Sequence, residues 1–136
     1  MECVVIERLK DRRIIVFGGA TGIGAATVKR LCVEGAKVCA ADINLEGAVR
    51  TAAEAGDNAF AVYADIADEA SVQKAVDAAV AKLGGLDGAH LNAADLRVIF
   101  DDSDAAAIDL GVFDRTIAVN LRGPLLCTRA VLPHLL

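Results

Sequence analysis

Three glycines that follow a short apolar run constrain the fold of this chain more than any other feature. The run Arg13–Phe17 is apolar and rich in β-branched residues, which predicts a buried strand, and the segment Ile23–Glu34 has helical spacing. Gly18 and Gly22 lie between them, and Gly24 is the second residue of the helical segment. A turn without Cβ atoms lets backbone N–H groups approach a phosphate closely, and a helix N-terminus adds partial positive charge. The strand, loop and helix together therefore predict a pyrophosphate-binding turn.

Each glycine of this turn has its own expected role. Gly18 would permit the tight turn, Gly22 the close approach of a phosphate, and Gly24 the packing of the helix on the strand. The spacing is G-x-x-x-G-x-G rather than the commoner G-x-G-x-x-G. Ala25-Ala26 argues against a P-loop, which needs Lys followed by Ser or Thr at this point. For the glycine pattern alone, a tight turn that binds nothing stays open as an alternative.

Strands and helices alternate regularly along the rest of the chain. Further strands are predicted at Lys37–Ala41, Ala59–Tyr63 and Leu86–Leu91, and further helices at Leu45–Ala55, Asp68–Leu83 and Leu110–Leu136. This order favours a parallel sheet, and 55% hydrophobic residues with only 4% aromatic ones suit buried strands covered by alanine-rich helices. We expect one α/β domain over residues 1–136, a Rossmann-type doubly wound sheet truncated after the fourth strand and the long helix that follows it.

The last third of the chain is predicted to be a polar loop and then one long helix. The loop spans Asp95–Asp109, and its acidic residues lack the spacing of a calcium-binding loop. Gly123-Pro124 should kink the helix. One face of it repeats an apolar residue every four positions, at Phe113, Ile117 and Leu121.

Acidic and small polar residues follow three of the predicted strands. Asp42 lies 18 residues after Gly24, where a carboxylate can accept both hydroxyls of an adenosine ribose. Because it would repel a 2′-phosphate and no basic residue occupies positions 40–45, we predict NAD rather than NADP. Asp65 could accept from the adenine amino group, and Asn92 begins a run of small residues that leaves room for a nucleotide. A helix cap for Asp42 and a turn for Asp65 remain open alternatives.

These pieces together resemble the short-chain dehydrogenase/reductase family. The resemblance covers nearly the whole chain, from about Leu9 to its end. Gly18–Gly24 is similar to that family's TGxxxGxG cofactor loop, Asp65-Ile66 to its Asp-Val pair, and Val119–Gly123 to its Val-Asn-Leu-x-Gly segment. The residues thereby implied to hold NAD are Gly18, Thr21, Gly22, Ile23, Gly24, Asp42, Ile43, Asp65, Ile66, Asn92, Ala93 and Ala94.

Three positions depart from the family pattern. Phe17 stands where a Thr hydroxyl usually steadies the loop. Leu91 and Ala94 replace the first Asn and the Gly of an Asn-Asn-Ala-Gly segment. These changes bear on the central strand and on the affinity for the cofactor.

The resemblance implies hydride transfer between nicotinamide and an alcohol or carbonyl substrate. The family's catalytic set is Asn, Ser, Tyr and Lys, in which Lys lowers the pKa of a Tyr phenol so that it can exchange a proton with the substrate. Of this set only Asn120 is present, implied to link by hydrogen bonds to the Lys; a polar residue that stabilises a helix bend is the alternative. The sole tyrosine, Tyr63, is followed four residues later by Ala67 rather than Lys. We expect this chain alone to be inactive.

Two other functions stay open at this point. One is a nucleotide-binding module without chemistry of its own. The other is a Rossmann-like domain that binds S-adenosylmethionine, because that fold serves methyltransferases as well.

Charge and composition argue against several partners. The net charge is −5 and no basic residues cluster, which argues against nucleic acid. No apolar run is long enough to cross a membrane. With no secretion signal and no paired cysteine spacing, we expect reduced thiols in a cytoplasmic protein, with Cys32 and Cys39 in the core and no metal. His90 and His134 are expected to be structural. The resemblance implies a homo-oligomer formed through the long C-terminal helix.

Overall fold

The alternating strands form one parallel sheet in the computed structural model, which describes residues 7–136. The strands are β1 (Arg13–Phe17), β2 (Lys37–Asp42), β3 (Ala59–Tyr63) and β4 (Gly88–Leu91). Their order across the sheet is β3-β2-β1-β4. The chain therefore moves outward from β1 to β3 and then crosses back to the other side of β1. This reversal places the switch point of the sheet between β1 and β4.

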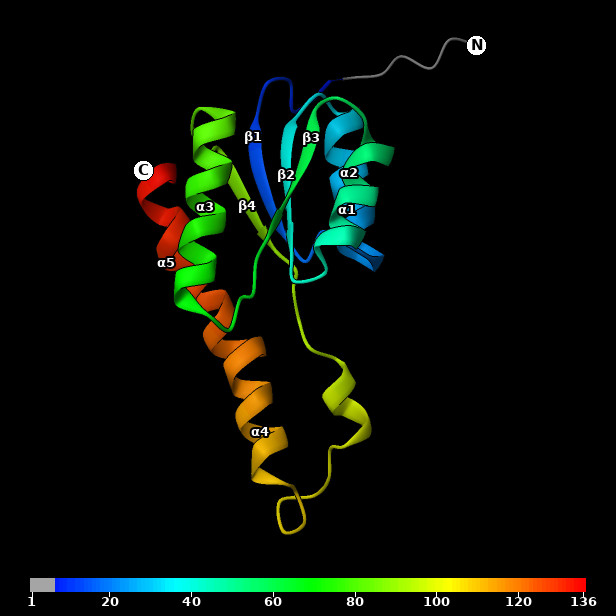
Figure 1. Ribbon diagram of the computed structural model, residues 1–136, viewed down its shortest axis with the longest axis vertical. Coiled ribbons are helices and arrows are strands. Elements are labelled where there is room, and N and C mark those ends of the chain that lie inside the picture. The colour runs from blue at the N-terminus through cyan, green and yellow to red at the C-terminus, as the bar shows by residue number, and fades with distance from the viewer. Residues whose placement is uncertain (1–6) are drawn as a thin grey trace.

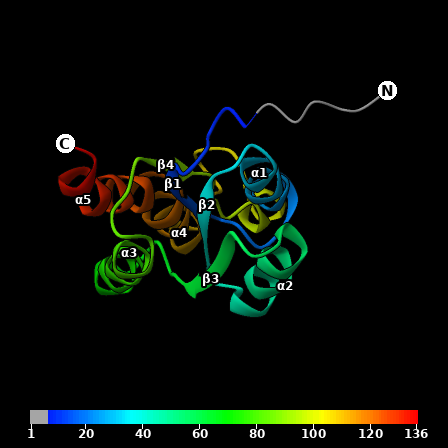
Figure 2. The same cartoon turned by 90° about the horizontal axis from the view of Figure 1, so that it is seen from above.

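Helices cover both faces of the sheet (Figures 1 and 2). On one face lie α1 (Gly22–Val33) and α2 (Leu45–Ala55), and on the other lie α3 (Glu69–Leu83) and α5 (Gly123–Leu135). Because side chains of a strand alternate between faces, Val16 belongs to the core under α1 and α2, whereas Ile15 and Phe17 belong to the core under α3 and α5. The predicted doubly wound α/β fold is confirmed.

Short side-chain caps fix where the helices begin. The Asn44 side chain accepts a hydrogen bond from the Gly47 N–H at the start of α2. Asp68 accepts from the Ala70 N–H at the start of α3. Both helices therefore begin directly beyond the carboxyl ends of strands, where the loops of the candidate site lie.

The long final helix differs from the prediction in one respect. It consists of α4 (Leu110–Ile117), a π-helical turn over Ala118–Arg122, and α5. The predicted distortion near Gly123-Pro124 takes the form of this wider turn, in which the Gly123 N–H bonds to the Ala118 carbonyl. Pro124 has no N–H to bond to the carbonyl four residues earlier, so the regular ladder cannot continue through it.

The sequence predicts a loop between β4 and α4, but part of this segment is helical. It includes the short 3-10 helix η1 (Arg97–Phe100). Together with α4, this segment extends beyond the carboxyl ends of the strands (Figure 1). Asp95, Leu96 and Arg97 at its start line a cavity beside the glycine loop together with Arg115 of α4, whereas the rest of the segment reaches away from the sheet.

Strand β4 begins at Gly88, two residues later than predicted. Asp87 is held instead by Arg13, whose Nε and Nη2 donate to the carboxylate at 2.8 and 2.9 Å. This pairing holds the pKa of Asp87 well below its usual range. Within residues 7–136, β4 pairs only with β1 and is an edge of the sheet.

Two of the cysteines described lie in the core. Cys39, predicted to be a core residue, is fully buried, and so is Cys127, whereas Cys32 is only half-buried. Cys3 lies outside the described residues. Over residues 7–136, no helix has the length and hydropathy needed to cross a membrane.

Candidate cofactor-binding site

A cavity of about 690 Å³ opens at the carboxyl ends of the strands. It falls within the size range of small-molecule and cofactor sites. Of the twelve residues implied to hold the cofactor, eleven line it: Gly18, Thr21, Gly22, Ile23, Asp42, Ile43, Asp65, Ile66, Asn92, Ala93 and Ala94. The twelfth, Gly24, does not line the cavity, and neither does Asn120, the predicted catalytic residue. Residues scattered over nearly eighty positions of sequence therefore meet at one place.

The glycine loop is fixed by the end of β2. The N–H groups of Gly18 and Gly19 both donate to the Ala41 carbonyl, at 2.8 and 3.2 Å. The Ala20 N–H donates to Asp42 Oδ2 at 3.0 Å, and Thr51 Oγ1 donates to the Ala20 carbonyl. These bonds hold the loop without the hydroxyl that Phe17 lacks, since Phe17 itself is buried in the core.

Gly22 and Gly24 are required for different reasons. Gly22 has φ +54, and a Cβ there would meet nothing within 4 Å, so the space beside it is open. At Gly24 a Cβ would lie 1.8 Å from the Gly18 carbonyl oxygen. The first glycine thus leaves the cavity accessible to the loop backbone, and the second lets α1 pack against the loop.

The start of α1 offers unpaired donors beside the cavity. Thr21 is the N-cap, but its side chain makes no capping bond. Within the described part of the chain, the N–H groups of Gly22 and Ile23 have no acceptor, and the first turn contains no acidic residue. Donors and helix dipole together favour an anionic group at this point.

Asp42 lies at the end of β2 with acceptor capacity to spare. Its Oδ2 accepts from the Ala20 N–H, and its Oδ1 accepts from the Asn44 N–H at 2.8 Å. Each carboxylate oxygen can accept a second hydrogen bond. The side chain that caps α2 is that of Asn44, so Asp42 does not take the capping role that was its alternative.

Asp65 forms the predicted turn and keeps one carboxylate oxygen free of hydrogen bonds from residues 7–136. Its Oδ1 accepts from the Ala67 N–H at 2.9 Å, which is the turn-forming role. Its Oδ2 has no hydrogen-bond partner among residues 7–136, and Asp65 lines the cavity. Ile66 beside it is nearly buried and contacts the position of Gly123, so this corner of the cavity is packed against α5.

The end of β4 is held to the loop despite its departures from the family pattern. Asn92 donates its N–H to the Phe17 carbonyl at 3.0 Å, and its Nδ2 lies 3.4 Å from the Gly18 carbonyl oxygen. A Cβ at Gly18 would lie 2.7 Å from the Ala93 nitrogen, so the two backbones are in close contact. Leu91 pairs with Phe17 in the sheet.

A charged cluster in the cavity wall was missed from the sequence. Asp95 is buried, and its carboxylate accepts from Arg97 Nε and Nη2 at 3.0 and 2.9 Å and from Arg115 Nε at 3.1 Å. The bonds from Arg97 are the main reason that the pKa of Asp95 lies well below its usual range, although burial acts in the opposite direction. Arg115 comes from α4, twenty residues away, so sequence spacing gave no signal of the pairing.

Asn120 holds the same segment through hydrogen bonds from its side chain to the backbone of Asp95. Its Oδ1 accepts from the Asp95 N–H at 2.7 Å, and its Nδ2 donates to the Asp95 carbonyl at 3.1 Å. The side chain thus joins the π-helical turn to the segment after β4. Its predicted catalytic role is not tested by this geometry, which shows a residue that positions the cavity wall.

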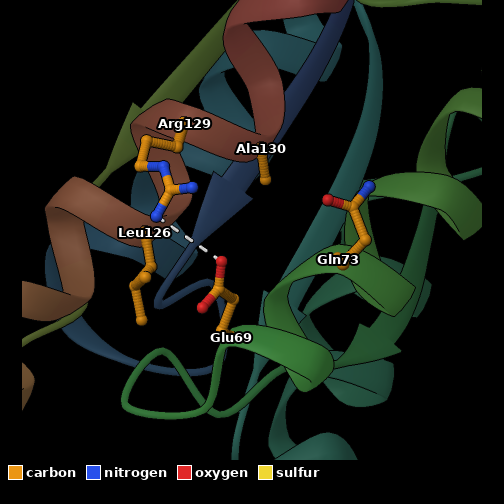
Figure 3. A pocket seen from close by; sticks show the side chains of 5 residues that line it. All are labelled: Glu69, Gln73, Leu126, Arg129 and Ala130. Atoms are coloured by element: carbon orange, nitrogen blue, oxygen red, sulfur yellow. Dashed lines mark ion pairs between the residues drawn. The ribbon is translucent and has the colours of Figure 1, made fainter.

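A second cavity, of about 90 Å³, lies between α3 and α5. Its wall includes the ion pair between Glu69 and Arg129, 3.5 Å apart, with Gln73, Leu126 and Ala130 around it (Figure 3). It is too small for a nucleotide. The larger cavity is therefore the candidate site.

Comparison with known proteins gives consistent results. Residues 12–136 match the family model described as short chain dehydrogenase. Sorbitol dehydrogenase of Cereibacter sphaeroides is 38% identical over 124 residues, which are 91% of this chain and 47% of that protein. D-threitol dehydrogenase of Mycolicibacterium smegmatis is 38% identical over 127 residues, again 91% of this chain and 47% of that protein.

Solved structures of related proteins share the fold. The 3-ketoacyl-(acyl-carrier-protein) reductase from Brucella melitensis, complexed with NADH, has a TM-score of 0.82 and 37% identity and covers 93% of this chain and 50% of its own. A short chain dehydrogenase from Burkholderia cenocepacia, in complex with NADP, has a TM-score of 0.83 and 36% identity and covers 94% of this chain and 52% of its own. This chain spans about half the length of the relatives that it matches. On the family match and these similarities, it belongs to the short-chain dehydrogenase family, whose members are oxidoreductases that bind nicotinamide cofactors in a Rossmann-type fold.

Proposed function

We propose that this chain is the NAD(H)-binding part of an oxidoreductase that transfers hydride between nicotinamide and an alcohol or carbonyl. The observation that supports this most directly is the cavity, which gathers eleven residues implied to hold the cofactor. The bound dinucleotide would supply the hydride chemistry. The chain's own residues bind it, orient it and leave room for a substrate beside it.

Each part of the cavity suits one part of NAD(H). The unpaired N–H groups at the start of α1 would bind the pyrophosphate, and the open space at Gly22 would let it approach. Asp42 would accept the ribose hydroxyls with its remaining lone pairs. Asp65 Oδ2 would accept from the adenine amino group, with Ile66 beneath the ring. Asn92–Ala94 would line the passage toward the nicotinamide.

Asp42 is also the basis for preferring NAD over NADP. Its carboxylate lines the cavity, and no basic residue occupies positions 40–45 to balance a 2′-phosphate. Relatives solved with NADH and with NADP both exist, so the choice depends on the residues of this chain. A negative charge placed at the ribose would disfavour the additional phosphate.

Titration of the chain with NADH, NADPH and S-adenosylmethionine tests the proposal. We expect NADH to bind and NADPH to bind at least about tenfold more weakly. In Asp42→Asn this preference should shrink, whereas Asp57→Asn, which removes an exposed carboxylate far from the cavity, should leave it unchanged. Binding of S-adenosylmethionine without NADH would contradict the proposal. Binding of NADH without turnover on secondary alcohols would fit a chain that lacks the family's Ser, Tyr and Lys.

Self-association through α4 and α5 is a further part of the proposal. Several large apolar side chains of these helices and of the turn between them are exposed, among them Leu110 and Phe113 in α4, Leu121 in the turn and Leu125 in α5. Burying such a surface in a copy of the same chain would remove it from water. Sedimentation that shows a stable monomer at low concentration would contradict this. The cytoplasmic location expected from the sequence stays a prediction as well.

A further inference from the structure

The cluster of Asp95, Arg97 and Arg115 has more charge than its internal pairing requires. Its two guanidiniums stay protonated at any ordinary pH, and its single carboxylate stays ionised, so one positive charge remains. The Asp95 side chain is only 7% exposed, whereas those of Arg97 and Arg115 are 83% and 48% exposed. The carboxylate is thus enclosed, and the arginines face the cavity and solvent.

Both arginines keep donors that the cluster does not use. Arg97 uses Nε and one Nη2 hydrogen for Asp95, and Arg115 uses only Nε. Within residues 7–136, Nη1 of Arg97 and both Nη atoms of Arg115 have no acceptor. Since Asp95 is itself held by Asn120 through its backbone, the guanidiniums are anchored before any ligand arrives. Such an arrangement is suited to a carboxylate or a phosphate.

The location of these donors separates them from the cofactor residues. Of the described residues that line the large cavity, Arg97 and Arg115 are the only basic ones. The glycine loop meets an anion with backbone N–H groups, and Asp42 and Asp65 are acidic. Asp95 follows directly on Asn92–Ala94, which leads away from the loop. An anionic group at the arginines would therefore belong to a second molecule beside the dinucleotide.

We propose that Arg97 and Arg115 bind an anionic group of the substrate, so that this protein favours hydroxy or oxo compounds with a carboxylate or phosphate end. The inference rests on the proposed function, because it takes the rest of the cavity to be filled by NAD(H). It distinguishes this chain from a site for neutral polyols.

Three probes with the same six-carbon chain test it: sorbitol, which is neutral, gluconate, which has a carboxylate, and sorbitol 6-phosphate. Each is titrated by NMR into the chain saturated with NAD⁺, in low and in high salt. We expect one or both anions to bind roughly tenfold more tightly than sorbitol, and the advantage to shrink with salt. Equal binding of all three probes overturns the proposal.

Variants then locate the site. Arg97→Gln and Arg115→Gln should each reduce the advantage of the anions by roughly fivefold or more and leave NADH affinity within about twofold. Arg122→Gln is the matched control, because Arg122 is exposed and does not line the cavity. Arg115→Lys keeps the charge, so it should retain much of the phosphate preference even where the glutamine variant fails to fold.

The NADH measurement keeps the two proposals apart. If the glutamine variants lose NADH binding instead, the arginines serve the cofactor and the inference is wrong, although the proposed function stands. If the parent chain does not bind NADH, the proposed function fails; the same titrations without cofactor then support the arginine site if the anions bind more tightly than sorbitol and the glutamine variants lose that advantage, and they overturn it otherwise.

Discussion

Replacing Gly24 by alanine should destabilise the fold, because the added methyl group would clash with the glycine loop. The new Cβ would lie 1.8 Å from the Gly18 carbonyl oxygen and 2.8 Å from its carbon, and ordinary contact begins at 3.4 Å. Both atoms belong to the backbone of the glycine loop, which is held by the end of β2, and the Asn92 side chain lies 2.9 Å from the new Cβ as well. The start of α1 would have to move away from the loop by about 1.5 Å, which overpacks a dense interior.

The expected cost is about 2–3 kcal/mol of unfolding free energy, the upper part of the range of roughly 1–3 kcal/mol for overpacked sites, because neither the loop nor the helix can yield easily. For a chain of this length that corresponds to a fall in Tm of roughly 6–12 °C. Thermal unfolding followed by circular dichroism measures it, and NADH titration on the same samples measures the site. We expect weaker NADH binding as well, because the displaced turn contains the donors for the pyrophosphate.

Gly22→Ala is the matched control for this argument. Its Cβ would meet nothing within 4 Å, so only the left-handed backbone conformation is strained, at about 1–2 kcal/mol. It should therefore lower Tm less than Gly24→Ala but still impair NADH binding, since its methyl group occupies the open space of the cavity. If Gly24→Ala melts with the parent, or if Gly22→Ala is the less stable of the two, the steric reasoning is refuted.

Three further predictions concern stability and reactivity. Bonds from arginines lower the pKa of Glu34 from 4.5 to about 2, so its stabilisation is complete above pH 4.5 and is lost as the pH falls toward 2; Glu34→Gln should flatten acid unfolding curves in that window, and an unchanged slope would contradict this. Asn120→Ala should cost about 2–3 kcal/mol and speed hydrogen exchange at the Asp95 amide, because both backbone bonds to Asp95 are lost. Burial raises the pKa of Cys39 and of Cys127 to about 12, so peptide mapping after thiol labelling should find both unmodified until the chain is unfolded; rapid labelling of either in the native chain would show that it is accessible.

Local patterns were sufficient to predict the sheet and the position of the glycine loop. Short apolar runs predicted the strands, and helical spacing of apolar residues predicted the helices, because both signals act within a few residues. Boundaries failed where a distant partner intervened. Strand β4 starts two residues later than predicted, where Asp87 pairs with Arg13. The π turn of the final helix has a local cause instead, since Pro124 cannot continue the regular hydrogen-bond ladder.

Only the part of the site that lies at the ends of the strands was predictable from the sequence. Carboxyl ends of parallel strands meet at one edge, so Asp42, Asp65 and Asn92 had to lie near the glycine loop once the topology was known. The cluster of Asp95 and its two arginines had no such rule. Its members come from the segment after β4 and from α4, and their meeting depends on how that segment folds back.

The sequence by itself therefore determined the fold class, the loop and the family, because periodicity, glycine and strand-end residues act through local backbone geometry. The tertiary structure alone decided which lone pairs of Asp42 and Asp65 are already used, that Asn120 holds Asp95, and that two arginines face the cavity with donors to spare. Hydrogen bonds and charge balance depend on distances between segments far apart in sequence. For the same reason the glycine loop could be identified from the sequence, whereas the charge of a substrate bound beside the cofactor could be inferred only from the structure.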